Sequence, residues 1–292
     1  MWAEKVPIAK IHLHEYNLSL YRNKTMKDKT FTLIKDVQII CTVWDNVKKP
    51  IGVIQIIHGI YDKIETYDRF AKLMNKNGYI VFGTKHQSCK CDKEKLCYFD
   101  KSVDIQTNIM KHLVARYNLP LFLFGYGYGA IITQSILQQS TIPTAGICLA
   151  NTGQYPTALI NIATFFAWFC TKIFGEDAPA KILNRLSFGK RRLRSAPKCT
   201  YGFYLSLFRG IKTIKQYAPF DTPMLMISGA HDSFATNPCF SRSLYNAYRD
   251  NGIMHITMII YPDKNDNLLM EMNFGTMPND ILDFFKSAQS SN

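Results

Sequence analysis

The chain has 292 residues, of which 47% are hydrophobic and 20% charged. These fractions are ordinary for a globular protein, and the length fits one large α/β domain or two small ones. The formal charge of +13 is unusual. It favours an anionic partner, such as phospholipid headgroups, nucleic acid or an acidic protein, over a neutral one, unless it marks only a lysine-rich solvated face.

The N-terminal residues and the cysteines both bear on location. Residues 1–21 are mixed polar and lack the apolar core of a secretory signal. The eight cysteines are scattered, without the spacing of a disulfide scaffold. We therefore predict reduced thiols and a cytoplasmic protein.

Strands and helices are predicted to alternate through the first half of the chain. Residues 31–44 indicate a hairpin, and residues 53–57 form the short apolar run typical of a buried parallel strand. The following elements are a helix at 64–76, a strand at 79–82, a helix at 103–117, a strand at 121–124, a helix at 128–139 and a strand at 144–149. This alternation predicts an α/β fold with a doubly wound, mostly parallel sheet.

The alternation breaks over residues 151–218, which are aromatic, partly helical and basic. It resumes with a strand at 224–228, a helix at 240–248, a strand at 255–261 and a helix at 280–285. A segment inserted after the sixth strand is predicted to form a helical cap over the carboxyl edge of the sheet, where open α/β sheets bind ligands. We expect a single domain over residues 1–292, with the cap at 151–218 inside it.

The most informative stretch is residues 121–130, an apolar strand that runs through a glycine-rich turn into a helix. Gly125, Gly127 and Gly129 have the spacing of a nucleophile elbow, G-x-S-x-G, but Gly127 stands where the serine belongs. The motif that indicates the fold therefore lacks the nucleophile.

Four blocks carry a resemblance to a known family: residues 53–60 with 67–71 and 77–79, residues 121–130, residues 222–232, and Tyr261-Pro262 with 268–271. In this order they resemble the monoacylglycerol lipase and lysophospholipase branch of the α/β-hydrolases. The resemblance implies hydrolysis of monoacyl lipid esters by a serine, histidine and aspartate triad. It also implies an oxyanion hole made by the backbone N–H groups of Ile60 and Tyr128, and it makes Asp232 the acid of the triad.

The chain departs from that family at three places. Gly127 occupies the serine position, and Asp266 occupies the histidine position. Where the family carries Asp-His-Arg-Gly-His-Gly, only His86 is kept. Glycine offers no nucleophile, and an ionised carboxylate has no proton to relay to a leaving alcohol. We therefore predict a catalytically degenerate protein, a pseudoenzyme that binds a lipid or a protein through a retained pocket and cap.

Two alternatives remain open. One is an active carboxylic ester hydrolase on monoacyl lipids that uses a non-standard site, and the other is a basic adaptor at a membrane surface. Tyr128 is a poor substitute nucleophile because no base is visible beside it. His86 and His231 are each interpreted as loop histidines.

Aromatic residues gather in the predicted cap at Phe165, Phe166, Trp168 and Phe169. They either pack onto the sheet or face lipid, backed by the basic run at residues 190–194. Residues 158–170 are too few for a membrane span and are interpreted as a buried or interfacial helix. The basic run has no accompanying nucleic-acid motif, so the expected partners are a monoacyl lipid, a membrane surface or a protein.

No metal or cofactor is expected. His86, Cys89, Cys91 and Cys97 have C-x-C spacing, a poor match to zinc sites. The acidic stretch from Asp263 to Glu271 lacks the glycine of a calcium loop.

Overall fold

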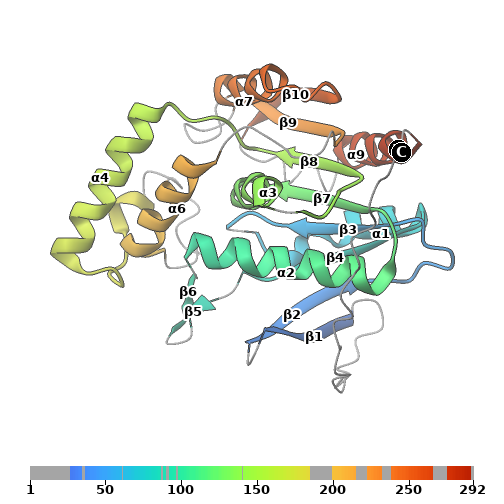
Figure 1. Cartoon of the computed structure of the whole chain (residues 1–292), viewed down its shortest axis with the longest axis horizontal. Coiled ribbons are helices and arrows are strands. Elements are labelled where there is room, and N and C mark those ends of the chain that lie inside the picture. Colours follow the sequence, from blue (N-terminus) through green and yellow to red (C-terminus); the bar gives the residue numbers. More distant parts are fainter. Residues whose placement is uncertain are drawn as a thin grey trace, which may run out of the picture.

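The computed structural model describes residues 27–34, 37–60, 62–86, 88–89, 92–96, 98–139, 141–184, 199–214, 222–231, 238–265 and 275–290. Its centre is an eight-stranded sheet made of β1 (Lys27–Ile34), β2 (Val37–Trp44), β3 (Gly52–Ile57), β4 (Tyr79–Thr84), β7 (Leu121–Tyr126), β8 (Gly146–Ala150), β9 (Met224–His231) and β10 (Ile256–Asn265). The strand order is β1-β2-β4-β3-β7-β8-β9-β10 (Figure 1).

Strand direction follows the sequence prediction. β1 pairs with β2, and β2 with β4, in antiparallel fashion. The other pairs of this sheet, β4-β3, β3-β7, β7-β8, β8-β9 and β9-β10, are parallel. The predicted hairpin and the mostly parallel sheet are both confirmed.

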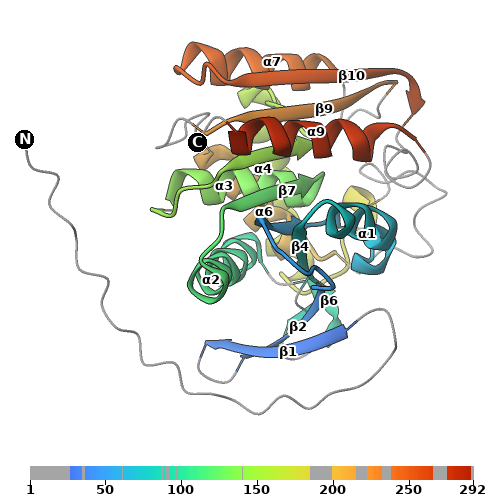
Figure 2. The same ribbon diagram turned by 90° about the vertical axis from the view of Figure 1, so that its right-hand side faces the viewer.

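Helices cover both faces of the sheet (Figure 2). The short 3-10 helix η1 (Ile64–Tyr67), α1 (Asp68–Lys76) and α9 (Met277–Ser290) supply the apolar residues of one face. On the other face lie α2 (Phe99–Tyr117), α3 (Tyr128–Gln139) and α7 (Pro238–Asp250). The sheet is therefore doubly wound, as predicted.

Alternating side chains along the central strands join the two cores. In β3, Val53 and Ile57 belong to the core of α2 and α3, whereas Ile54 and Ile56 belong to the core of α1 and α9. Successive side chains of a strand point to opposite faces, so a strand buried on both faces is nearly all apolar. Gln55 of β3 is an exception, and its buried amide donates to Gln106. This explains the continuous apolar runs in the sequence.

Among the described residues, the helices α4 (Thr157–Phe174) and α6 (Tyr201–Thr213) follow β8, the sixth strand of the central sheet in chain order, and pack against each other. Their position agrees with the predicted insertion after the sixth strand. Figure 1 shows both lying beyond the ends to which the arrows of β7 and β8 point, so the insertion stands at the carboxyl edge.

Several boundaries differ from the prediction. α2 begins at Phe99 and not at residue 103, because Phe99 is buried and packs against Tyr128, with ring centroids 6.2 Å apart. β10 continues to Asn265, and α9 extends over Met277–Ser290. The loop after β4 contains a two-stranded pair that the sequence pattern did not indicate, β5 (Ser88–Cys89) with β6 (Asp92–Leu96).

Candidate functional site

Gly127 forms the turn between β7 and α3. Its φ of +53° lies in the left-handed region that side-chain-bearing residues rarely adopt. Its N–H donates to the carbonyl oxygen of Ala150 at 2.9 Å, and its own carbonyl accepts from the N–H groups of Ala130 and Ile131. These bonds tie the turn to β8 and begin α3, so the elbow keeps a defined geometry without its serine.

The outer glycines of the motif are required for a different reason. A Cβ on Gly129 would lie 1.8 Å from the carbonyl oxygen of Ile57, and one on Gly125 would lie 2.5 Å from Oγ1 of Thr133. A Cβ on Gly127 would meet nothing within 4 Å among the described residues. Gly129 allows α3 to approach β3, and Gly125 allows α3 to approach β7, whereas the central position has room for a side chain.

The loop after β3 carries the predicted oxyanion donor Ile60. The carboxylate of Asp62 accepts from the N–H of Gly59 at 3.1 Å and from the hydroxyl of buried Tyr67 at 3.0 Å. Burial and the charge of Asp62 raise the pKa of Tyr67 well above its ordinary value, so the phenol remains a donor. Within the described part of the chain the N–H of Ile60 makes no backbone hydrogen bond, as an oxyanion donor requires.

Two histidines donate hydrogen bonds to backbone carbonyls of the same loop. Nδ1 of His58 donates to the carbonyl oxygen of Gly59 at 2.7 Å, and Nε2 of His86 donates to that of His58 at 2.8 Å. Burial lowers the pKa of His58, and burial together with the neighbouring His58 lowers that of His86 well below its ordinary value of 6.5. Both imidazoles are therefore neutral near pH 7.

The ring of Tyr128 packs against His86 with centroids 5.1 Å apart. The expectation that no base lies beside Tyr128 is therefore wrong, because β4 ends next to β3 and delivers His86 to the elbow. The Tyr128 ring also contacts Phe203, and it is buried in the core. His86 lies in the loop after β4, as expected from the sequence, and is half-buried in this contact.

Two of the predicted triad positions are not described. Asp232 and Asp266 lie outside the described residues, as do Cys91 and Cys97. The structure therefore brings together Gly127, Tyr128 and the loop of Ile60, and the other assignments stay predictions. Within the described ranges no three His, Cys, Asp or Glu side chains gather closely enough to hold a metal ion.

Sequence reasoning missed the role of His58. It follows the apolar run of β3 and is only 4% exposed. A buried polar residue at the carboxyl end of a central strand was the signal that could have identified it.

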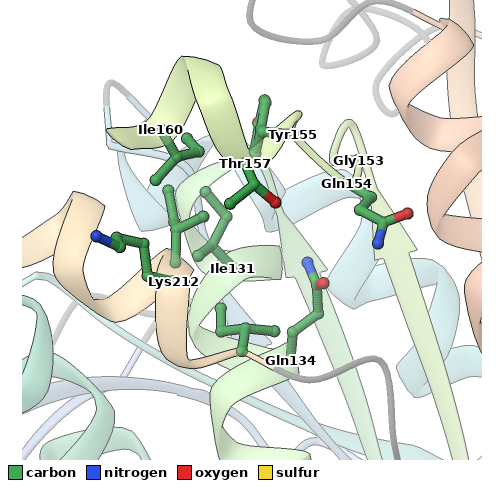
Figure 3. Close-up of a pocket in the computed structure, with 10 residues that line it drawn as sticks. Ile131, Gln134, Gly153, Gln154, Tyr155, Thr157, Ile160 and Lys212 are labelled. Carbon is green, nitrogen blue, oxygen red and sulfur yellow. The ribbon is translucent and has the colours of Figure 1, made fainter. Parts of the chain in front are cut away.

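A cavity of about 200 Å³ lies between α3, the start of the insertion and the end of α6 (Figure 3). Ile131 and Gln134 of α3 form part of its wall, and Ile131 lies one turn along the helix from Gly127. The other lining residues are Gly153, Gln154, Tyr155, Thr157, Ile160, Ile211, Lys212 and Ile214. The cavity therefore lies between α3 and the inserted helices, one helical turn from the elbow, and its described lining does not include Gly127, Tyr128 or Ile60.

The outer face of α4 is apolar and exposed. Phe165 is 64% exposed, Trp168 39% and Phe169 48%. The interpretation that these rings pack onto the sheet is therefore wrong for these three, and only Phe166 packs against the core. Of the described helices, α4 alone is long and apolar enough to cross a membrane, and 22% of it is buried.

Comparisons with known proteins agree with this geometry. The family model described as serine aminopeptidase, S33, matches residues 48–273. A search of curated proteins finds no match to the sequence.

Solved structures share the fold at low sequence identity. A highly thermostable carboxyl esterase from Bacillus coagulans is 14% identical with a TM-score of 0.71, covering 94% of this chain and 98% of its own. A soluble variant of monoglyceride lipase from Saccharomyces cerevisiae, in complex with a substrate analog, is 14% identical with a TM-score of 0.65, covering 96% and 97%. A monoacylglycerol lipase from Paleococcus ferrophilus is 13% identical with a TM-score of 0.63, covering 86% and 100%.

Proposed function

The chain belongs to the serine aminopeptidase S33 family of α/β-hydrolases. We propose that it binds a single-chain lipid without hydrolysing it. Residues 151–218 act as the cap of the binding site, and the helices α4 and α6 cover the cavity beside the elbow. The protein is then a catalytically degenerate relative of esterases and lipases.

The observation that carries the proposal is Gly127. Covalent ester hydrolysis in this family begins with attack by a side-chain oxygen at the elbow. Gly127 has no side chain, although the turn itself and the space for a side chain are kept. Retention of the turn without its nucleophile supports a site that still receives a ligand and no longer forms an acyl-enzyme.

The neighbouring histidines do not offer a replacement relay. Each donates a ring N–H to a backbone carbonyl, His58 to Gly59 and His86 to His58. Burial keeps both neutral, and rotation of either ring would leave a carbonyl of the loop unpaired. Their arrangement favours a structural role over proton transfer.

Hydrolysis and binding are tested separately. The purified chain is incubated with a fluorophosphonate probe and with a monoacylglycerol, and lipid binding is measured by displacement of a fluorescent fatty acyl probe. We expect neither labelling nor turnover, together with saturable displacement. Labelling that disappears when one particular residue is substituted would overturn the proposal and favour the active hydrolase. Absence of saturable binding would overturn the binding half.

A second candidate, association with a membrane surface, is favoured by the exposure of Phe165, Trp168 and Phe169. Aromatic residues on an exposed helix face, near an excess of basic residues, are typical of interfacial helices. Partition onto anionic liposomes should fall when these three residues are changed to serine. The matched control is Met254→Ser, since Met254 is 66% exposed and lies outside the insertion. Equal partition of both variants would exclude this candidate.

A further inference from the structure

The wall of the cavity is mainly aliphatic. Four isoleucines from three parts of the chain line it, and they are Ile131, Ile160, Ile211 and Ile214. An apolar cavity of about 150 Å³ is large enough to bind benzene. A cavity of about 200 Å³ therefore accommodates a short alkyl chain or the end of a longer one.

The polar lining residues are neutral except for one. Gln134 is buried, and its Nε2 donates to Oγ1 of Thr152 at 3.1 Å, which fixes the amide. Lys212, in the last turn of α6, is the one charged residue among the described residues of the lining. Lys212 is exposed, which places it at the rim. Figure 3 shows it across the cavity from Gln134, with its ammonium turned outward from the other lining residues.

The ammonium of Lys212 has no protein partner within the described ranges. No hydrogen bond or ion pair involves it there, whereas Lys72 pairs with Asp68 and Lys85 with Glu65. No acidic residue lines the cavity among the described residues. The one charge at the rim is therefore positive and available to a ligand.

The insertion also concentrates the charge of the chain. Residues 151–218 contain eleven of its 35 Lys and Arg but only two of its 22 Asp and Glu, which are Glu176 and Asp177. The resulting excess of nine positive charges accounts for most of the total of +13. Such a field raises the local concentration of anions and repels cations.

We infer that the cavity takes a single-chain anionic amphiphile, with the alkyl chain against the isoleucines and a carboxylate or phosphate at Lys212. The inference rests on the proposed function and makes it more specific, because a neutral monoacyl ester would fill the same wall but leave the ammonium unpaired. A charge-assisted bond at the rim distinguishes the two classes of ligand. The ligand then resembles the acid released by an esterase more than the ester that an esterase consumes.

The experiment compares four ligands with the same ten-carbon chain: decanoate, decyl phosphate, 1-decanoylglycerol and decyltrimethylammonium. Displacement of a fluorescent acyl probe from the full chain is measured in physiological salt, below the micellar concentration of each ligand. We expect decanoate or decyl phosphate to bind at least about tenfold more tightly than the glycerol ester, the ratio that one such bond of about 1.4 kcal/mol produces. The stronger of the two anions identifies the headgroup as carboxylate or phosphate.

Variants separate the contact of a ligand with Lys212 from the effect of the overall positive charge of the insertion. Lys212→Met should remove the preference for anions and leave ester binding unchanged. Lys181→Met is the matched control, because Lys181 is an exposed lysine of the insertion that does not line the cavity. Ile214→Trp, which fills the cavity, should weaken all ligands.

The outcomes separate the inferred anion contact at Lys212 from the proposed function. If the ester binds as tightly as the anions, or if Lys181→Met removes the preference as fully as Lys212→Met, the inference is overturned while the proposed function stands. If none of the four ligands displaces the probe, the proposed function fails as well.

Discussion

The rings of His58 and His86 lie with their centroids 4.1 Å apart, and Nε2 of His86 donates to the carbonyl oxygen of His58 at 2.8 Å. His58 in turn donates to the carbonyl oxygen of Gly59. The two histidines therefore hold the two peptide carbonyls that precede Ile60. The position of the predicted oxyanion donor depends on two neutral imidazoles, the buried one of His58 and the half-buried one of His86.

This pair predicts a loss of stability in acid. Burial holds the folded-state pKa of both histidines below the unfolded value near 6.5. Below that value the unfolded chain binds protons that the folded chain does not, so stability is full above pH 6.5 and declines as the pH falls. Each histidine contributes up to about 1.4 kcal/mol per pH unit. Urea denaturation between pH 7.5 and 5 measures the slope.

Substitution of single histidines shows which groups cause the decline of stability with falling pH. His86→Gln keeps an N–H donor but does not titrate, so it should flatten the decline. His255→Gln serves as the control, since His255 is exposed, and it should leave the slope unchanged. An unchanged slope in His86→Gln would show that the decline comes from other groups.

Serine at the elbow should destabilise the fold without creating an esterase. The positive φ of Gly127 costs a side-chain-bearing residue about 1–2 kcal/mol, although there is room for the side chain. We expect Gly127→Ser and Gly127→Ala to lower the free energy of unfolding by this amount, equally in urea denaturation. Gly127→Ser should show no turnover of a monoacylglycerol. Turnover by this variant would show that a functional relay is present and that the assignment of Asp266 to the histidine position is wrong.

The neighbouring glycine gives a contrasting prediction. A Cβ at position 129 would lie 1.8 Å from the backbone oxygen of Ile57, which no side-chain rotation relieves. Gly129→Ala should therefore cost about 3 kcal/mol or more, well above Gly127→Ala. Equal costs in denaturation experiments would contradict the close approach of α3 to β3.

The sequence was sufficient for the fold and for part of the site. Residues 121–130 predicted the elbow because its glycines respond to local requirements, a left-handed turn at Gly127 and a close backbone approach at Gly129. Parallel strands were predicted because both of their faces are buried, which makes the runs at β3 and β7 almost entirely apolar, with Gln55 of β3 as an exception.

The contact of His58 with His86 could not be predicted in this way. The two residues are 28 positions apart, and they meet because β3 and β4 are parallel neighbours whose carboxyl ends share an edge. Apolar periodicity specifies neither strand order nor the placement of rings beyond a strand. Similarly, α4 is apolar on nearly all sides, so its pattern did not indicate that Phe165 faces outward.

The carboxylate of Asp62 is expected to stabilise the loop through its two donors. Asp62→Ala leaves the hydroxyl of fully buried Tyr67 unpaired and should cost about 2–3 kcal/mol. Tyr67→Phe removes the donor together with its need for a partner and should cost about 1 kcal/mol. Thermal or urea denaturation compares them. A larger loss in Tyr67→Phe than in Asp62→Ala would mean that packing of the phenol, and not its hydrogen bond, stabilises the loop.

Truncation of two phenylalanines of the insertion should lower the free energy of unfolding by very different amounts. Phe203 is 1% exposed and packs against Tyr128 with centroids 5.6 Å apart, so Phe203→Ala removes core contacts and should cost about 3–5 kcal/mol. Phe165 is 64% exposed, so Phe165→Ala should change the free energy of unfolding by less than about 0.5 kcal/mol. Urea denaturation of the isolated chain would measure both changes in the free energy of unfolding. A cost for Phe165→Ala that rises with protein concentration would indicate that the exposed face of α4 joins two copies of the chain, and it would then compete with the membrane as the partner of that face.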